Sequence, residues 1–197
     1  MATRLDRSAF MARHVPGALY APMNKTFNTV VGSLVTDETM PFVLIIDEEH
    51  VEEALLDLVR IGYDNIVGFV TPEGLEHYFE AGGACATIEE ITFEDVARMK
   101  DDENVKVLDA RFAREYAEAH VPGAVNASYT RLPDYFEERV PKDKTLLVHC
   151  ASGARAAAAS AFLARNGYEV KYVNDAFAAY AEKYEVEMDK SALAEVA

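Results

Sequence analysis

The fold is decided by the stretch Thr145-Leu146-Leu147-Val148-His149-Cys150-Ala151-Ser152-Gly153-Ala154-Arg155. Its apolar first half is typical of a buried strand, and the alanine-rich run from Ala156 to Arg165 is typical of a helix. A cysteine therefore lies where a strand turns into a helix. In an α/β protein this is the carboxyl edge of the sheet, where ligands bind.

The loop that follows Cys150 is suited to hold an anion. Its residues are small, so several backbone N–H groups can turn inward around the sulfur and form an anion-binding nest. These dipoles, the helix N-terminus and the Arg155 guanidinium all favour the thiolate over the thiol. We therefore expect Cys150 and Arg155 to be catalytic. We expect the substrate to be bound by Ala151, Ser152, Gly153 and Ala154.

The alternative interpretation of Cys150 is a small buried hydrophobic residue at the end of a strand, which is the usual role of a free cysteine. That interpretation makes no use of Gly153, of Arg155 or of the abrupt change from strand to helix. We therefore favour the catalytic interpretation.

Composition limits the kind of partner. The chain has 197 residues, enough for one large domain or two small ones, and half of them are hydrophobic. Its formal net charge of −15 argues against binding to nucleic acid or to an anionic membrane. Small molecules and proteins remain as partners.

Cysteine usage and hydropathy indicate the compartment. Cys85 and Cys150 lie far apart and form no disulfide framework, which is typical of a reducing cytosol. The N-terminal residues contain no apolar signal segment, and no apolar run approaches membrane-spanning length. We expect a cytoplasmic protein.

The chain contains an internal repeat. Phe10-Met11-Ala12-Arg13-His14-Val15-Pro16-Gly17-Ala18 matches Tyr116-Ala117-Glu118-Ala119-His120-Val121-Pro122-Gly123-Ala124, with an offset of 106 (120 − 14). Val43 to Asp47 likewise parallels Leu146 to Cys150. Two copies of one α/β unit follow, each too long for a solenoid repeat.

The first copy covers residues 1–82 and the second residues 88–186, with the paired glycines Gly82 and Gly83 marking the linker. The pattern predicts strands, then helices, in alternation. In the first copy they are strand 42–46, helix 48–60, strand 65–70 and helix 72–79. In the second they are a helix from Thr92, strand 105–109, helix 112–119, strand 125–127, helix 132–140, strand 145–149, a helix after Arg155, strand 169–173 and helix 176–184. This alternation predicts parallel, doubly wound sheets.

The second copy resembles a rhodanese domain over residues 88–184. Four features carry the resemblance: Val107-Leu108-Asp109-Ala110-Arg111, the turn His120-Val121-Pro122-Gly123-Ala124, the strand into Cys150, and the six-residue loop from Cys150 to Arg155. The resemblance implies a sulfurtransferase in which Cys150 takes the outer sulfur of thiosulfate or a thiol persulfide and passes it to a thiol or to cyanide. It implies no metal or organic cofactor.

The first copy resembles a rhodanese domain that has lost its cysteine, because Asp47 stands at the position of Cys150. It is also truncated: 13 residues precede His14, whereas 32 (120 − 88) lead from Ile88 to His120. Such a pair is similar to the C-terminal part of bacterial fusions whose front part is a persulfide dioxygenase. We therefore expect either that the chain is a piece of a longer fusion, or that a second chain such as a persulfide dioxygenase, or a second copy of this chain, covers the incomplete, apolar sheet.

Other polar residues are expected to be structural. Asp109 and Arg111 are placed to pair and lock a loop, although Arg111 is retained as a substrate-binding candidate. His120 is expected to bond the backbone of its turn. His149 points to the opposite face of the sheet from Val148 and is not assigned as a base. Cys85 is expected to be inert.

Two functions from other classes remain open. Protein tyrosine phosphatases also place His-Cys before a loop that ends in arginine, but they have five residues between cysteine and arginine, whereas four separate Cys150 from Arg155. A non-catalytic interaction module is the second alternative, and it suits the first copy better than the second.

Overall fold

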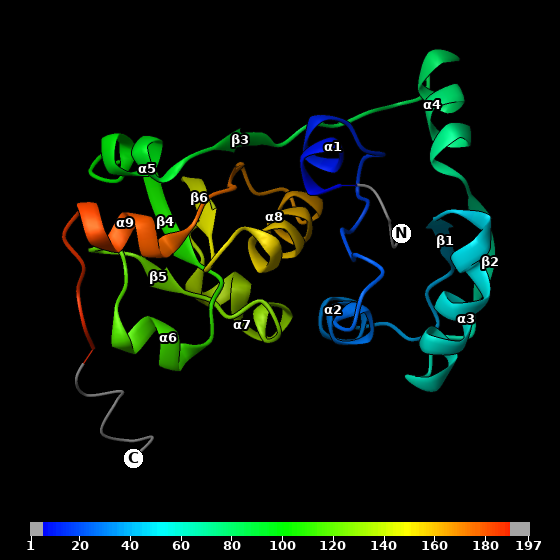
Figure 1. Ribbon diagram of the computed structural model, residues 1–197, viewed down its shortest axis with the longest axis horizontal. Coiled ribbons are helices and arrows are strands. Elements are labelled where there is room, and N and C mark those ends of the chain that lie inside the picture. Colours follow the sequence, from blue (N-terminus) through cyan, green and yellow to red (C-terminus); the bar gives the residue numbers. More distant parts are fainter. Residues whose placement is uncertain (1–5, 190–197) are drawn as a thin grey trace.

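The computed structural model describes residues 6–189. The elements are α1 (Arg7–Ala12), α2 (Phe27–Leu34), β1 (Phe42–Ile45), η1 (Glu48–His50), α3 (Val51–Arg60), β2 (Ile66–Val70), α4 (Pro72–Glu80), β3 (Glu89–Ile91), α5 (Phe93–Met99), β4 (Val105–Asp109), α6 (Ala113–Glu118), β5 (Val125–Asn126), α7 (Leu132–Arg139), β6 (Thr145–His149), α8 (Ala154–Arg165), β7 (Val170–Val173) and α9 (Phe177–Lys183). Figure 1 shows one sheet at each end of the molecule, with α1 and α2 between them.

The second copy forms a five-stranded parallel sheet with the strand order β3-β7-β6-β4-β5. β4 and β6 pair over five positions, from Val105 opposite Thr145 to Asp109 opposite His149. The α/β class with a parallel sheet is therefore confirmed. Because β6 is the middle strand, Cys150 follows it at the centre of the carboxyl edge.

Both faces of this sheet are covered. Leu146 and Val148 of β6 point to one face, where α8 packs, and both belong to the larger hydrophobic cluster. Leu147 points to the other face, in a second cluster that contains Phe93 of α5 and Phe177 of α9. Because side chains alternate between the two faces of the sheet, β6 contacts helices on both sides.

Helix α8 is buried nearly all round. Eight consecutive residues, Ala156 to Leu163, are buried, and five of the eight are alanine. α8 contacts β6 and β7 on one side and α1 of the first copy on another. Small side chains allow this close approach on several sides at once.

The first copy forms a smaller sheet. β1 and β2 pair in parallel, and within residues 6–189 they make a two-stranded sheet. The predicted strands and helices are present, with one correction: Glu48–His50 is a 3₁₀ turn, and the α-helix begins only at Val51. Three acidic residues in succession at 47–49 favour the positive end of a helix but supply no glycine for a wider loop.

The two histidines of the matching sequence segments have similar local contacts. Nδ1 of His14 lies 2.8 Å from the carbonyl oxygen of Phe10, and Nδ1 of His120 lies 2.8 Å from that of Tyr116. Each histidine also stacks on the ring four residues before it. The expectation that His120 bonds the backbone of its turn is confirmed.

The two copies share one hydrophobic core. A single cluster contains Phe10, Phe27 and Leu44 of the first copy together with Leu146 and Ala158 of the second. The proposed boundary at residues 82–88 therefore separates the two sheets but does not divide the core. α1, α2 and β3 were not predicted from the sequence. Two of them, α1 and α2, belong to the first copy and join it to the second, because α1 contacts α8 and α2 contacts α7.

Candidate active site

Cys150 directly follows β6 and precedes α8 by three residues. Ala151 and Ser152 are exposed, whereas Cys150 itself is only 1% exposed. The loop reaches solvent, but the sulfur lies beneath it. A reactive group at the floor of a loop meets a substrate only through the opening that the loop leaves.

Gly153 determines the shape of the loop. It has φ +87° and is the N-cap of α8, in the left-handed region that favours glycine. A Cβ atom there would lie 2.6 Å from the Tyr172 hydroxyl and 2.7 Å from Oδ1 of Asn174. Neither a side chain nor another backbone conformation fits, so the loop geometry requires this glycine.

The backbone N–H groups of residues 151–156 are available to a ligand. None of them donates to an acceptor within the described part of the chain, and the first α8 bond of this region runs from Ala157 N to Gly153 O. They stand at the N-terminus of a 12-residue helix, where the helix dipole favours negative charge. This arrangement supports the predicted anion-binding nest around Cys150.

Arg155 is held by an acidic residue that the sequence analysis missed. Its guanidinium donates to both carboxylate oxygens of Glu115, at 2.5 and 2.8 Å. The hydrogen bond from Arg155 lowers the pKa of Glu115, and Glu115, followed by the nearby Cys150 side chain, raises the pKa of Arg155. Arg155 thus stays charged, in a fixed position next to the sulfur.

Three aromatic side chains surround the same region. The pKa of Tyr129 and that of Tyr172 are both raised, first by burial and further by the negative charge of a Cys150 thiolate. Phe112 is 47% exposed, and the Arg155 guanidinium carbon lies 5.3 Å from the centre of its ring. Phe112 and Tyr129 give the site an apolar wall on one side.

Arg111 is engaged elsewhere. It binds both carboxylate oxygens of Asp109 at 2.6–3.0 Å, donates to the carbonyl oxygen of Ala119 at 2.6 Å, and lies over the Phe177 ring at 3.9 Å. Asp109 is fully buried. These contacts lock the turn between β4 and α6, as the structural interpretation of this pair expects.

His149 lies on the opposite face of the sheet from Val148, as expected. It is fully buried, stacks on Phe177 at 5.6 Å, and its Nε2 lies 3.7 Å from Asp109. Burial lowers its pKa, so the ring is neutral at physiological pH. A neutral imidazole enclosed by aromatic rings supports β6 and is not placed to take a proton from a substrate.

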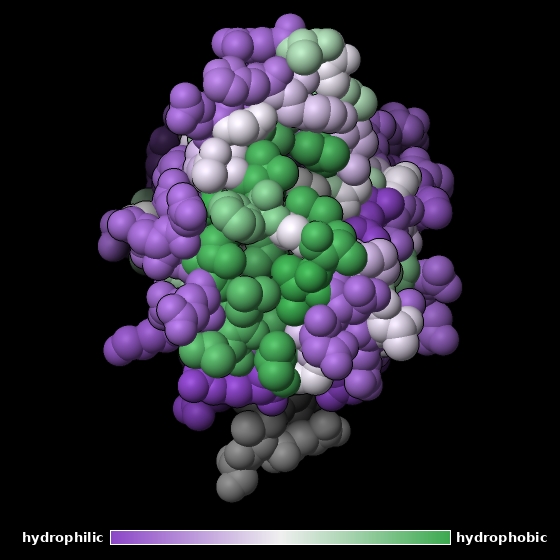
Figure 2. Space-filling model, turned by 90° about the vertical axis from the view of Figure 1, so that its right-hand side faces the viewer, coloured by the Kyte–Doolittle hydropathy of each residue, from purple (hydrophilic) through white to green (hydrophobic). Residues whose placement is uncertain are grey.

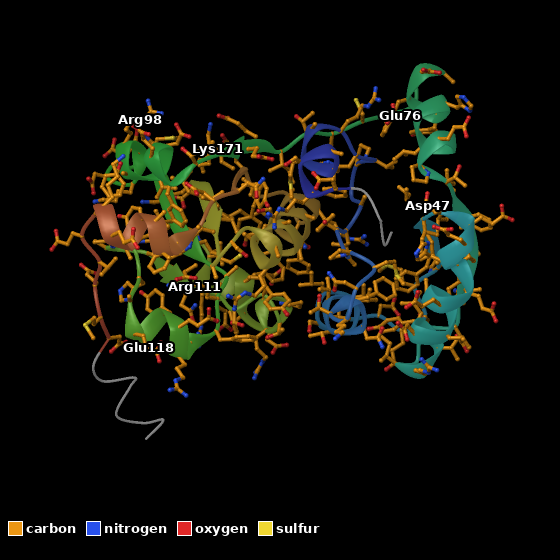
Figure 3. The ribbon with its side chains drawn as sticks, in the orientation of Figure 1. Asp47, Glu76, Arg98, Arg111, Glu118 and Lys171 are labelled. Atoms are coloured by element: carbon orange, nitrogen blue, oxygen red, sulfur yellow. The ribbon has the colours of Figure 1, made fainter. Side chains whose placement is uncertain are left out.

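The corresponding position in the first copy has a different shape. Asp47 follows β1 and accepts the backbone N–H of His50 at 3.0 Å, which closes the 3₁₀ turn. Within residues 6–189 only glycines have positive φ, and this turn contains none. Figure 3 shows Asp47 at the far end of the molecule from Arg111, well away from the second copy's sheet.

Comparison with known proteins decides the family. The model of the rhodanese-like domain matches residues 92–183, which include the whole loop from Cys150 to Arg155. A thiosulfate:glutathione sulfurtransferase from Saccharomyces cerevisiae is 33% identical over 97 residues, which cover 42% of this chain and 70% of that protein. The chain belongs to the rhodanese-like family.

Two further proteins are similar to this chain. A sulfurtransferase from Allochromatium vinosum is 34% identical over 82 residues, covering 41% of this chain and 76% of that protein. The crystal structure of a rhodanese-related protein from Thermoplasma volcanium is 26% identical, covers 51% of this chain and 98% of that one, and has a TM-score of 0.46. The rhodanese-like match begins at residue 92 and so leaves the first copy outside it.

No helix of the described residues is long and apolar enough to cross a membrane. Between residues 6 and 189, no group of three or more His, Cys, Asp or Glu side chains is arranged to hold a metal ion. Cys85 is an exposed free thiol in the linker.

Proposed function

We propose that this chain is a sulfurtransferase that carries sulfane sulfur as a persulfide on Cys150. The observation that carries the proposal is the loop itself: a cysteine beneath a ring of unbonded N–H groups at a helix N-terminus, beside a fixed guanidinium. Such donors stabilise a thiolate before the reaction and a persulfide anion after it. The names of the two similar sulfurtransferases support the same chemistry.

In the first step the Cys150 thiolate attacks the outer sulfur of thiosulfate or of a thiol persulfide. A new S–S bond forms to Cys150 as the donor's S–S bond breaks, and the electron pair leaves with sulfite or with the donor thiolate. The outer sulfur of the persulfide carries the negative charge. The N–H groups of residues 151–156 and the Arg155 guanidinium are the groups that hold this charge.

In the second step an acceptor takes the sulfur away. A thiolate or cyanide attacks the outer sulfur, the S–S bond to Cys150 breaks, and the Cys150 thiolate is restored. No net oxidation occurs over the cycle.

Each predicted site residue receives a role in this proposal. Cys150 is the nucleophile, Arg155 stabilises its charge, and Glu115 positions Arg155. Arg111 is assigned to positioning because its guanidinium is held by Asp109 and Ala119. The substrate is bound by the backbone of Ala151, Ser152, Gly153 and Ala154.

The phosphatase alternative is less well supported. Four residues separate Cys150 from Arg155, one fewer than a loop that wraps a tetrahedral phosphate. The Arg155 guanidinium already donates to both carboxylate oxygens of Glu115.

We also propose that residues 1–82 are an incomplete and inactive rhodanese-like domain in tandem with the active one at 88–186. The shared turn geometry of His14 and His120 supports this tandem, and the 3₁₀ turn after Asp47 supports the loss of activity. A cytoplasmic site of action follows from the absence of a disulfide pattern in the sequence. A persulfide dioxygenase remains a proposed partner, on the resemblance to the fusions.

A direct assay tests the function. Purified protein is mixed with thiosulfate or with glutathione persulfide, then with cyanide, and thiocyanate is measured; p-nitrophenyl phosphate hydrolysis is measured in parallel. The proposal expects thiocyanate and no phosphate release. Phosphate release without thiocyanate would assign the site to the phosphatase alternative, and neither product would favour the interaction module.

A further inference from the structure

The first copy carries most of the exposed apolar side chains. Eight large hydrophobic residues are exposed in the described part of the chain, and six of them lie between residues 42 and 78. Four of these come from α3 and β2, and we name them the first-copy apolar surface: Leu56, Val59, Val67 and Phe69. Figure 2 shows a broad hydrophobic patch on this side of the molecule.

The residues of this surface lie in neighbouring pairs and are not scattered singly. Val67 and Phe69 are two positions apart on β2 and point the same way, and Leu56 and Val59 are one turn apart on α3. Val67 is 63% exposed and Leu56 51%. Single exposed hydrophobic residues need no explanation, but a contiguous patch on a protein surface marks an interaction site.

The strands beside the patch also lack neighbours. Within residues 6–189, β2 pairs only with β1. In the second copy the matching strand β7 lies between β6 and β3, and β3 pairs with it over three residues. The first copy therefore has an open strand edge where the second has a partner strand, and an extended segment of another protein can pair there.

Charge decides which partner fits. Residues 37–80 contain twelve Asp and Glu and a single Arg, a formal net charge of −11 (1 − 12), which is most of the −15 of the chain. Figure 2 shows hydrophilic residues bordering the patch. A second copy would bring the same acidic border against this one, and an anionic membrane would be repelled in the same way.

We propose that the first-copy apolar surface docks a protein partner that presents an extended apolar strand bordered by Lys and Arg. The apolar side chains supply the contact area, the open edge accepts the strand, and the acidic border selects a basic partner over a second copy of this chain. The proposal stands apart from the sulfurtransferase chemistry, because none of its residues belongs to the Cys150 loop.

The experiment uses the full chain and two fluorescent synthetic peptides. In one peptide valine and leucine alternate with lysine, and in the other glutamate replaces every lysine; binding is measured by anisotropy. The lysine peptide is expected to bind, more weakly as ionic strength rises, and the glutamate peptide is not. Val67→Ser with Phe69→Ser should weaken binding about tenfold or more, whereas Met188→Ser, also at an exposed apolar residue, should leave it unchanged.

A charge-reversal variant completes the test. Glu52→Lys with Glu53→Lys, both exposed on α3, should weaken the lysine peptide and strengthen the glutamate peptide. Circular dichroism and sulfur transfer confirm that each variant is folded. The proposal is overturned if neither peptide binds, if both bind alike, or if the Val67 and Phe69 changes have no effect. Sedimentation equilibrium that shows a dimer lost in the Val67→Ser, Phe69→Ser protein would assign the surface to a second copy and overturn it too.

Discussion

The two copies make the same turn from strand to helix in different ways. After β6 the chain forms a loop of small residues with Gly153 at positive φ, and a 12-residue helix follows. After β1 it forms a 3₁₀ turn of acidic residues, and a 10-residue helix follows. From the turn to the next shared landmark there are 17 residues in the second copy (Cys150 to Gly167) and 15 in the first (Asp47 to Gly62). The segment after β6 is therefore two residues longer than the segment after β1, and it contains a glycine at positive φ that the turn after Asp47 lacks.

The sheets around these turns differ as well. β6 has a strand on each side and helices over both faces, so the Cys150 loop stands on a fully packed base. β1 has one neighbouring strand within the described residues, and apolar side chains around it remain exposed. In the proposals above, the copy with the fully packed sheet carries the sulfur transfer, and the copy with the exposed apolar side chains docks a partner.

The largest expected effect concerns the two cysteines. Cys150→Ser should reduce sulfur transfer on the order of a thousandfold or more, because the nucleophile is lost. Cys85→Ser should leave the rate unchanged, since Cys85 lies exposed in the linker. Thiocyanate formation measures both. If Cys85→Ser removed the activity and Cys150→Ser kept it, the site would lie outside the loop.

The loss of sulfur transfer in Cys150→Ser should remain when a cysteine is introduced at position 47 of the first copy. In the double variant Cys150→Ser, Asp47→Cys, the new thiol would sit at a 3₁₀ turn with no glycine at positive φ and with Glu48 and Glu49 next to it. Like charge repels an anionic donor, so activity should stay as low as in Cys150→Ser alone. Recovery of transfer would show that the turn after β1 can serve as an active loop.

Arg155 should matter more than a second arginine on the same helix. Arg155→Ala should lower sulfur transfer roughly tenfold to a hundredfold, since it removes the charged donor beside the sulfur. Arg165 lies at the far end of α8, where it donates to the carbonyl oxygen of Gly17, so Arg165→Ala should change the rate little. If Arg155→Ala and Arg165→Ala lowered kcat/KM equally, Arg155 would have only the structural role of a helix residue.

Gly153→Ala tests the shape of the loop. The added methyl group would meet Tyr172 and Asn174 and would also be forced into positive φ, so unfolding free energy should fall by about 1–3 kcal/mol. Gly167→Ala is the matched control, because Gly167 also has positive φ but nothing lies within 4 Å of its added Cβ. Chemical denaturation compares the two. Identical losses would mean that the clash predicted at Gly153 does not arise.

The smallest expected effect is a dependence of stability on pH. Arg155 lowers the pKa of Glu115 below its ordinary value of 4.5, so the pair stabilises the folded state above that value and loses its contribution as pH falls through the lower, folded-state pKa. Because the pair is partly exposed, Glu115→Gln should cost less than about 1 kcal/mol. Melting temperatures of parent and variant should differ at neutral pH and converge in acid; a gap that widened in acid would contradict the assignment.

Much of the second copy could be predicted from its sequence. The strand from Val105 to Asp109 and the strand from Thr145 to His149 have the predicted bounds, because long apolar runs bounded by polar turns leave little ambiguity. Helix α8 begins at Ala154, two residues before the predicted start at Ala156, since Gly153 allows the helix to begin there. The position of Cys150 at a strand-to-helix turn followed from the same local pattern.

Long-range contacts could not be predicted in this way. Glu115 reaches Arg155 across 40 positions, and only its place in the first turn of α6 is readable from the sequence. Tyr129, Tyr172 and Asn174 converge on the loop from separate elements, and no local spacing connects them. The depth of Cys150 was also missed, because burial depends on how α8 and its neighbours pack and not on the loop sequence.

The intact mass of the protein, measured before and after treatment with a sulfur donor, tests whether Cys150 carries a persulfide. The protein is incubated with thiosulfate or glutathione persulfide, separated from the donor without reductant, and weighed by mass spectrometry. The account predicts a gain of one sulfur atom that disappears on addition of cyanide, is kept in Cys85→Ser and is absent from Cys150→Ser. A sulfur adduct of the same size on Cys150→Ser, or none on the parent protein, would contradict it.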